Sequence, residues 1–515
     1  MKRIVHAAIA LAAVLLSASP SLWADVRPAS LFTDNAVLQR DMPLPVWGKA
    51  DPGEKVVVQI GDQSASTTAD ADGRWMVKLD PLAAGGPVEV VIRGKNTVTL
   101  KNVLIGEVWI CSGQSNMAFM LINAHNGEEA VANSANDNIR LYTVPRKAEP
   151  EPQDTIDAAW QPCNPETSRY FSAVGYFFGK HLQEKLGVPV GLINTSVGGT
   201  PAEAWTCRAH LEATPEAAPI LAAYAEALKR YPEAMKQYEQ RLQEYREKVK
   251  QLRAEGKPIP RAPGAPMGPH HTHSPAGLYN AMIAPLVPYA IRGAIWYQGE
   301  SNSGRAYQYR ALFPAMIRCW RTHWNEGDFP FLFVQLAPFR DIVDEPTEST
   351  WAELREAQLL TMLNVPNTGM AVITDVGEEH DIHPKKKQPV GDRLAIAARA
   401  LAYGEKIEYS GPIYDRMEVQ GDKAVIHFTH VDGGLECRGE KLTGFTICGP
   451  DHKFVNAEAK IEGDTVVVWA EGVDKPVAVR FGWADYPVVN LWNKAGLPAS
   501  PFRTDDFPGI TQNAQ

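Results

Sequence analysis

Residues 108–117 read Val108-Trp109-Ile110-Cys111-Ser112-Gly113-Gln114-Ser115-Asn116-Met117. The apolar run at their start is typical of a buried strand, and Gly113 ends it. Ser115 then follows directly after the strand. A serine attacks only when a base takes its proton and donors hold the oxyanion that forms, and turn or cap serines share this local sequence. The interpretation of Ser115 as a nucleophile therefore depends on the rest of the chain.

Three later stretches contain residues that could serve as the base and the oxyanion donors, and each follows an apolar run. They are residues 195–205 (TSVGGTPAEAW), 296–302 (WYQGESN) and 381–384 (DIHP). Ligands of an open parallel sheet bind outside the carboxyl ends of its strands. We therefore expect these segments to meet Ser115 in one crevice.

In this order, the four segments resemble the SGNH hydrolase superfamily, and more closely its sialate O-acetylesterase and carbohydrate acetylesterase branch. The resemblance covers most of the chain. It implies an α/β fold with a flavodoxin-like parallel-sheet core and flanking antiparallel β-sandwich elements. It also implies a serine esterase that removes acetyl groups from carbohydrates through an acetyl-enzyme, and we expect neither a cofactor nor a metal.

His383 is the predicted base, because an imidazole titrates near neutrality and can accept the serine proton. It matches the Ile-His-Pro element of the family, whereas His380 does not. For the acid that orients the imidazole we rank Asp381 first and Glu300 second, and a Ser-His dyad without an acid is third. A carboxylate two residues before the histidine reaches the ring only through a tight loop.

The predicted oxyanion donors are the backbone N–H groups of Ser115 and Gly198 and the side-chain amide of Gln298. Glycine suits the second position because it lets the backbone approach the acyl group closely. The predicted substrate-binding residues are Gln114, Asn116, Trp205 and Trp492. For Trp205 a core position is the alternative, and for Trp492 the alternative is that it fixes a C-terminal β region to the core.

Residues 1–24 have the pattern of a secretory signal peptide: Lys2 and Arg3, an apolar run, then small residues up to Ala24. The apolar run is too short for a membrane-spanning helix, and an uncleaved amphipathic anchor is the alternative. We therefore expect a secreted or periplasmic protein whose mature form does not associate with membranes. The formal net charge of -9 also argues against nucleic acid as a partner.

The period of the apolar residues divides the remaining chain of 515 residues into three parts. Short alternating strands at 55–60, 75–79, 88–92 and 97–100 predict a β domain over 25–101, and strands at 424–429, 443–447, 465–469 and 477–482 predict another over 405–515. Between them, over 102–404, apolar strands at 105–111, 190–195, 290–297, 331–336 and 370–374 alternate with helices at 168–186, 306–324, 349–363 and 391–403. This alternation predicts a parallel sheet covered on both faces.

A helical insertion over about 214–256 carries apolar residues at alternating spacings of three and four, from Leu221 to Leu252. We expect Pro232 to end one helix or start the next. The stripe indicates a helical arm that packs on the core or on another subunit, so the arm is a predicted contact for a homo-oligomer.

Six cysteines do not make a disulfide scaffold in so long a chain. Cys437 and Cys448 are the favoured pair, whereas Cys111, Cys207 and Cys319 have the contexts of buried thiols. The histidines at 270, 271 and 273 lie in a loop rich in proline and glycine. A stretch that faces solvent or substrate is favoured there over a metal site.

The expected function is thus a carbohydrate O-acetylesterase acting on sialic acid or on acetylated hemicellulose. A lipid or thioester acylhydrolase on the same scaffold and a non-catalytic carbohydrate-binding protein are the alternatives.

Overall fold

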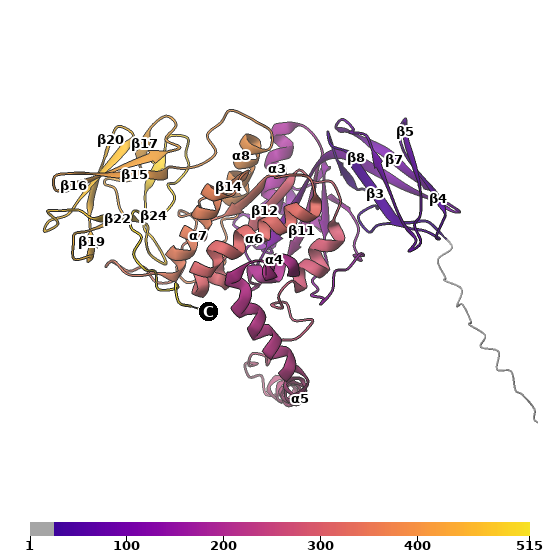
Figure 1. Cartoon of the computed structure of the whole chain (residues 1–515), viewed down its shortest axis with the longest axis horizontal. Helices are drawn as coiled ribbons and strands as arrows, with labels where there is room; N and C mark the ends of the chain where they lie inside the picture. Colours follow the sequence, from indigo (N-terminus) through magenta and orange to yellow (C-terminus); the bar gives the residue numbers. More distant parts are fainter. Residues whose placement is uncertain (1–24, 515) are drawn as a thin grey trace, which may run out of the picture.

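The computed structural model describes residues 25–514, so the predicted signal peptide lies outside the described residues. A central α/β body lies between two β regions, one at each end of the chain (Figure 1). Within 25–514, no helix combines the length and the apolar character needed to cross a membrane.

The central sheet contains six parallel strands in the spatial order β9-β11-β8-β12-β13-β14, and β10 (Gln161–Cys163) adds antiparallel to β9. The six are β8 (Thr97–Gly113), β9 (Asn136–Thr143), β11 (Val190–Ser196), β12 (Gly293–Tyr297), β13 (Phe331–Val334) and β14 (Thr368–Ala371). Without β9, and with the other five strands numbered 1 to 5 in chain order from β8 to β14, the spatial order is 2-1-3-4-5, a common doubly wound arrangement. Every residue of β11 to β14 is buried, as expected for a sheet covered on both faces.

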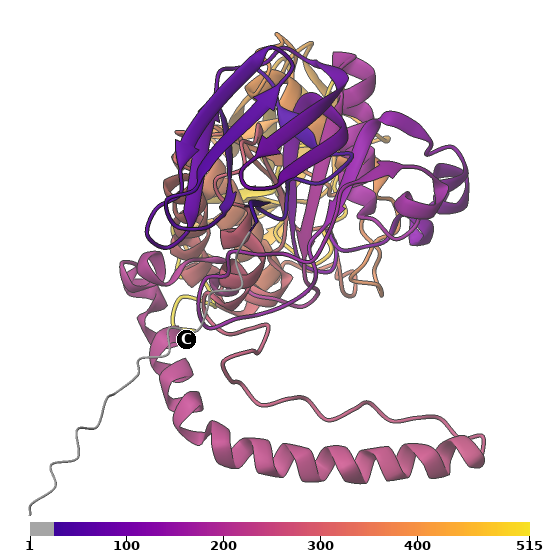
Figure 2. The ribbon, with the colours of Figure 1, turned by 90° about the vertical axis from the view of Figure 1, so that its right-hand side faces the viewer.

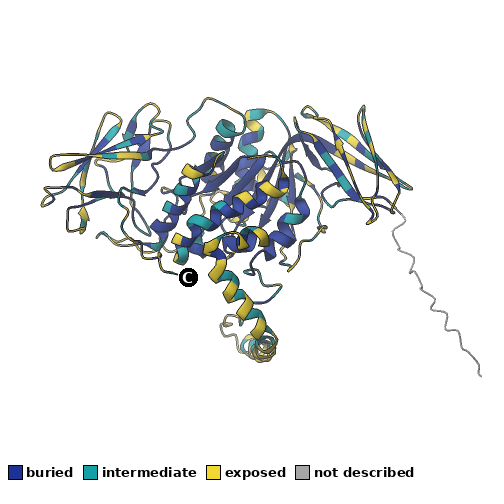
Figure 3. Ribbon diagram, viewed as in Figure 1, coloured by how far each residue is buried: buried dark blue, intermediate teal, exposed yellow. Residues whose placement is uncertain are grey.

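Helices cover both faces of this sheet. On one face, α3 (Ala173–Leu186) and α8 (Gln388–Leu401) pack on the side of the sheet that carries Trp109. On the other face, α6 (Ala306–Trp324) and α7 (Thr350–Asn364) pack on the side that carries Trp296. Figure 3 shows the resulting buried core as the dark blue centre of the molecule. The predicted α/β architecture is confirmed.

Apart from the long helix of the insertion, α5 (Ala218–Ala254), the remaining helices are short. They are η1 (Leu121–Asn123), α1 (Gly127–Ala132), α2 (Pro165–Ser168), η2 (Ala202–Trp205), α4 (Arg208–Glu212), η3 (Pro215–Ala217), the π-helix η4 (Tyr279–Ile283), η5 (Ala284–Leu286) and η6 (Glu300–Arg305).

The N-terminal β region shares a strand with the core. It contains β1 (Arg27–Pro28), β2 (Val37–Gln39), β3 (Leu44–Lys49), β4 (Lys55–Ile60), β5 (Gln63–Thr68), β6 (Arg74–Leu79) and β7 (Gly85–Arg93). Its pairings are antiparallel except that β2 runs parallel to β8. Because β8 pairs with β7 and then continues into the central sheet, it crosses the domain boundary expected at residue 101.

The C-terminal β region contains two four-stranded antiparallel sheets, β15-β16-β21-β20 and β19-β18-β22-β24, and the pair β17-β23. Its strands are β15 (Ile413–Gln420), β16 (Lys423–Thr429), β17 (Leu435–Cys437), β18 (Phe445–Cys448), β19 (Phe454–Asn456), β20 (Glu458–Glu462), β21 (Thr465–Trp469), β22 (Ala478–Phe481), β23 (Leu491–Asn493) and β24 (Phe502–Arg503). Side chains of both four-stranded sheets, such as Ile426 and Ile447, share one apolar core.

The helical insertion is one long helix, α5 (Ala218–Ala254), which extends away from the body and changes direction along its length (Figure 2). The expectation that Pro232 separates two helices is wrong, because Pro232 lies inside α5. Proline removes one backbone hydrogen bond and bends a helix without ending it when the flanking turns hold.

The heptad stripe of α5 is half-buried from Leu221 to Leu252, and no residue of the helix is fully buried. The chain returns along the arm: the Tyr245 hydroxyl donates to the Pro260 carbonyl at 3.0 Å, and Gly268 lies against the Tyr231 ring. These contacts partly cover the stripe within one chain. Self-association through the arm stays a prediction.

The expected disulfide between Cys437 and Cys448 is wrong, because every cysteine within residues 25–514 is a free thiol. The two residues lie in different sheets: Cys437 is in β17, which pairs with β23, and Cys448 is in β18, which pairs with β19 and β22. Cys111, Cys207 and Cys319 are buried, as predicted.

Candidate active site

The first three segments predicted from the sequence follow strands that end side by side. In the central sheet, Gly113 of β8 pairs with Ser196 of β11 and with Tyr297 of β12. Two backbone hydrogen bonds join the strand ends, from Val197 N to the Gly113 carbonyl at 3.1 Å and from Gln114 N to the Tyr297 carbonyl at 2.9 Å. Strand order reverses beside β8, and ligands of doubly wound sheets bind at such a point.

Only glycine fits at position 113. Its φ is +139°, and a Cβ atom there would lie 2.2 Å from the carbonyl oxygen of Tyr297. An L side chain would meet both backbone strain and a steric clash. This turn brings Ser115 out of the strand to a half-buried position.

Gly198 lies directly against Ser115. A Cβ atom at Gly198 would lie 3.4 Å from the Ser115 Cβ and 3.8 Å from its Cα. In the part of the chain that the structure describes, no hydrogen bond uses the backbone N–H of either residue. Two adjacent, unused backbone donors beside a serine are what an oxyanion hole requires.

The His383 loop is joined to the serine loop by Asn116. The Asn116 Nδ2 donates to the carbonyl oxygen of Ile382, the residue before His383, at 2.9 Å. The imidazole of His383 also stacks on the Phe119 ring, with centroids 6.5 Å apart and an interplanar angle of 28°. The predicted nucleophile and base therefore lie on loops that touch each other.

Asp381 contacts His383 within a tight loop, as expected for a carboxylate two residues before the histidine. One Asp381 oxygen accepts a hydrogen bond from the His383 backbone N–H at 2.9 Å and lies 3.6 Å from the imidazole Nδ1. The contact with the ring is longer than a hydrogen bond, and catalytic hydrogen bonds often shorten only when substrate binds.

Glu300 forms a hydrogen bond with Asn116, and within residues 25–514 its hydrogen bonds and ion pairs do not include His383. Its Oε1 accepts from Asn116 Nδ2 at 2.6 Å, whereas its Oε2 is buried without a hydrogen-bond partner among the described residues. Burial raises the pKa of this carboxyl, although the Asn116 hydrogen bond and the Lys387 charge oppose the shift.

The sequence interpretation missed Lys387. Its neighbours Lys385 and Lys386 are exposed, so the three lysines look like one surface run, yet Lys387 itself is 1% exposed. Its Nζ donates to Asn116 Oδ1 and lies 4.9 Å from the centroid of the Phe119 ring. Burial lowers the pKa of Lys387 to about 7.

The pKa of His383 is lowered from its ordinary value, first by burial and then by the charge of Lys387, while Asp381 opposes the shift. A lowered pKa keeps the imidazole neutral at pH 7, which is the form that accepts a proton.

The structure contradicts the oxyanion role predicted for the Gln298 side chain. That amide is fully buried, and its Nε2 donates to the Thr200 carbonyl at 3.2 Å and to Asn302 Oδ1 at 2.7 Å. Both N–H protons are therefore already used. Gln298 holds the loop after β11 in place instead.

The prediction that Trp205 and Trp492 contact the substrate is also wrong. Trp205 is fully buried and packs edge-on against Trp296, with centroids 5.9 Å apart. Trp492, in β23, is 7% exposed, and the guanidinium carbons of Arg438 and of Arg393 in α8 lie 3.6 and 5.6 Å from the centroid of its ring. It fixes the C-terminal β region to the core, which was the alternative interpretation.

Gln114 and Asn116 are 2% and 1% exposed. Gln114 Oε1 accepts from the Ser301 backbone N–H at 3.3 Å, and the Asn116 amide is occupied by Glu300, Ile382 and Lys387. These contacts make them positioning residues; the substrate contact predicted for Asn116 is not supported.

A cavity of about 750 Å³ lies beside these loops, between the core and the base of the arm. Its lining includes Gly199, which follows Gly198, and Ser301, which follows Glu300. The other lining residues are Pro201, Glu203, Pro219, Ile220, Ala223, Tyr224, Ala227, Met267, His273, Pro275 and Arg305. His273 therefore lines this cavity, and contact of its loop with substrate stays a prediction.

The sequence and the fold are similar to those of known carbohydrate esterases. The family model described as carbohydrate esterase, sialic acid-specific acetylesterase matches residues 105–252 and 263–399. The chain is 31% identical to human sialate O-acetylesterase, over 96% of this chain and 97% of that protein, and 30% identical to the rat protein, over 92% and 94%. It is also similar to the crystal structure of a carbohydrate acetylesterase from Xanthomonas citri, with 38% identity and a TM-score of 0.80 over 94% of this chain and 100% of that one.

The fold and these matches define a carboxylic ester hydrolase of the carbohydrate acetylesterase class. Within this class, the chain belongs to the sialic acid-specific acetylesterase family of carbohydrate esterases. The predicted family and enzyme class are confirmed.

The charge of Lys387 should set the lower pH limit of activity. We expect Lys387→Met to move the acid limb of the kcat/KM profile to higher pH, because removal of a nearby cation lets His383 take up a proton more easily. Lys386→Met, which changes an exposed lysine next to it, should leave the profile unchanged. Profiles measured on p-nitrophenyl acetate provide the test, and an unshifted acid limb in a folded Lys387→Met enzyme would remove Lys387 from this role.

Proposed function

We propose that this protein hydrolyses O-acetyl esters of carbohydrates through an acetyl-enzyme intermediate on Ser115. The observation that carries the proposal is the contact between Gly198 and Ser115 beside the reversal of strand order, with both backbone N–H groups unused. Asn116 supports it by joining the His383 loop to the serine loop.

In the first step, the Ser115 oxygen attacks the acetyl carbonyl carbon while His383 takes the hydroxyl proton. The N–H groups of Ser115 and Gly198 stabilise the negative charge that develops on the carbonyl oxygen. The ester bond to the sugar then breaks, and His383 gives the proton to the departing sugar oxygen. Water, activated by His383, attacks the acetyl-enzyme and releases acetate.

We assign the orientation of the His383 ring to Asp381, which lies 3.6 Å from Nδ1. Glu300 has a different part: with Asn116 and Lys387 it forms the buried network beneath the two loops. The finer fold belongs to the same proposal. The spatial strand order is 2-1-3-4-5, with Ser115 after β8, the first strand in the chain, and His383 after β14, the last. This arrangement supports an SGNH-type core.

Export of the protein is a further part of the proposal. It is supported by the basic, apolar and small-residue pattern of residues 1–24, and a secreted or periplasmic location follows from it.

Ser115→Ala should lower kcat on p-nitrophenyl acetate by roughly 10⁴- to 10⁶-fold with an unchanged unfolding temperature, because members of one catalytic unit fail together. A fluorophosphonate should label Ser115 in the wild-type enzyme, as read by mass spectrometry of the peptides. Ser112→Ala is the matched control. A label on Ser112 or Ser196 would contradict the assignment.

Asp381→Asn should lower kcat by about 10²- to 10⁴-fold, because an amide favours the wrong imidazole tautomer. Glu300→Gln should cost less than about tenfold, because burial favours a neutral carboxyl at this position and an amide resembles it. Steady-state kinetics of both variants decide between them. A larger loss of kcat in Glu300→Gln than in Asp381→Asn would show that Glu300 orients the imidazole. Small and equal losses of kcat would support a Ser-His dyad without an acid.

Two substrates have separate support. The family description and the mammalian relatives favour O-acetylated sialic acid. The Xanthomonas citri relative is named a carbohydrate acetylesterase, and the guanidinium of Arg305 in the cavity is already paired with Glu203 at 2.7 Å, which favours an uncharged glycan over a carboxylate. Acetate release from acetylated sialic acid and from acetylated xylan or xyloglucan fragments distinguishes them.

The cavity at the base of the arm should bind the sugar. We expect Tyr224→Ala to lower kcat/KM on the preferred acetylated glycan by roughly 5- to 30-fold, since an aromatic ring covers the apolar face of a pyranose. The rate on p-nitrophenyl acetate should not change. Tyr238→Ala, on the same helix stripe but away from the cavity, is the control. Faster hydrolysis of p-nitrophenyl octanoate than of any acetylated glycan would favour the lipid acylhydrolase.

A further inference from the structure

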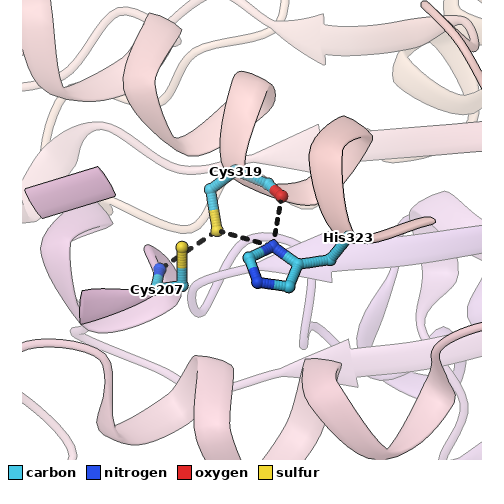
Figure 4. A group of neighbouring side chains, drawn as sticks. All are labelled: Cys207, Cys319 and His323. Carbon is cyan, nitrogen blue, oxygen red and sulfur yellow. Dashed lines mark hydrogen bonds between the residues drawn. The ribbon is translucent and has the colours of Figure 1, made fainter. Parts of the chain in front are cut away.

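Two cysteines and two histidines meet where α4 lies beside the end of α6. They occur in the sequence as Cys207-Arg208-Ala209-His210 and Cys319-Trp320-Arg321-Thr322-His323. On a helix, residues three or four apart lie on one side, so each pair presents its sulfur and imidazole together. Figure 4 shows the two sulfur atoms and the imidazole of His323 turned toward one another.

Three of these side chains have donor atoms close enough to share one metal ion, and His210 lies next to one of the three. Cys207 Sγ lies 3.1 Å from His210 Nδ1, and Cys319 Sγ lies 3.9 Å from His323 Nδ1. One donor atom each of Cys207, Cys319 and His323 lies within 4.8 Å of the other two. With Zn–S bonds of about 2.3 Å and Zn–N bonds of about 2.0 Å, neighbouring ligands of a tetrahedral zinc lie about 3.5 to 3.8 Å apart.

The surrounding groups already orient these ligands. The Cys207 backbone N–H donates to Cys319 Sγ at 3.1 Å, a contact that stabilises a thiolate. His323 Nδ1 lies 2.8 Å from the Cys319 carbonyl oxygen, and this contact holds the imidazole beside the Cys319 sulfur. The Tyr279 ring, in the π-helix η4, packs against His323 with centroids 5.3 Å apart.

We propose that Cys207, Cys319 and His323 bind a zinc ion, with His210 beside the Cys207 sulfur. Zn²⁺ would form two Zn–S bonds and one Zn–N bond, with water in the fourth position, and the two thiol protons would pass to solvent. The sulfur atoms belong to residues that are 5% and 0% exposed, and burial of two thiolates without a counter-ion is costly. A divalent ion makes the group electrically neutral, and the exposed His323 gives the ion a path from solvent.

The ion would fasten the segment after η2 to α6. The Trp205 carbonyl already accepts a hydrogen bond from Trp320 Nε1 at 2.9 Å, two residues before Cys207. The zinc therefore stabilises the continuation of the loop that starts at Gly198. This proposal does not depend on the esterase mechanism, since its test measures metal content.

The test uses the full-length protein produced with zinc in the medium and then dialysed. Elemental analysis should find one zinc per chain in the wild type and in two controls, Cys437→Ser and His270→Gln. Cys207→Ser and His323→Gln should weaken zinc binding by more than about 100-fold, since loss of a ligand should cost at least as much as loss of a group that supports one.

His323→Gln is included because His323 is exposed, so this variant should still fold even if the change at the buried Cys207 prevents folding. Replacement of zinc by Co²⁺ should give the absorption of tetrahedral thiolate coordination in the wild type and lose it in this variant. A disulfide between Cys207 and Cys319 in the purified protein, found by mass spectrometry after alkylation without reduction, would overturn the proposal. Zinc content equal in His323→Gln and wild type, or no zinc in any of the proteins, would also overturn it.

Discussion

The side chain of Asn116 holds the candidate site together. Its Nδ2 donates to Glu300 after β12 and to the Ile382 carbonyl in the histidine loop, and its Oδ1 accepts from Lys387 at the start of α8. One amide thus satisfies three polar groups from three different segments while being 1% exposed itself. A buried carboxyl and a buried ammonium are costly without such partners. The close approach of the serine and histidine loops therefore depends on this residue.

Features set by local physics could be predicted from the sequence. The helix predicted at 306–324 has the observed bounds of α6, because its apolar residues recur with the helical period. Strand β4 was predicted at its observed bounds because its residues alternate. The helix predicted from 168 begins instead at Ala173, where the Ser172 side chain accepts from the Gly175 N–H and caps it. The proximity of Ser115, Gly198 and the His383 loop could be predicted because each follows a strand of the parallel sheet.

Features set by long-range contacts could not be predicted. Nothing near Gln298 in the sequence shows that Thr200 and Asn302 occupy its amide. Lys387 looks like its exposed neighbours, and only the fold places it over the Phe119 ring. The pairing of Cys207 with Cys319 joins residues 112 positions apart. The topology of the sheet decides which polar groups come into contact, and these contacts cannot be predicted from the local sequence pattern.

Strand β8 runs without interruption over 17 residues, from its pairing with β7 to Gly113, two residues before Ser115. The N-terminal β region is therefore not an exchangeable cassette attached by a linker. A recombination event at the expected boundary would cut the strand that leads to Ser115, the proposed nucleophile, and a ligand that distorted the outer half of β8 would act on the turn at Gly113 through a continuous rigid element. Insertions in this protein are better tolerated where the chain already leaves the core, as at the arm.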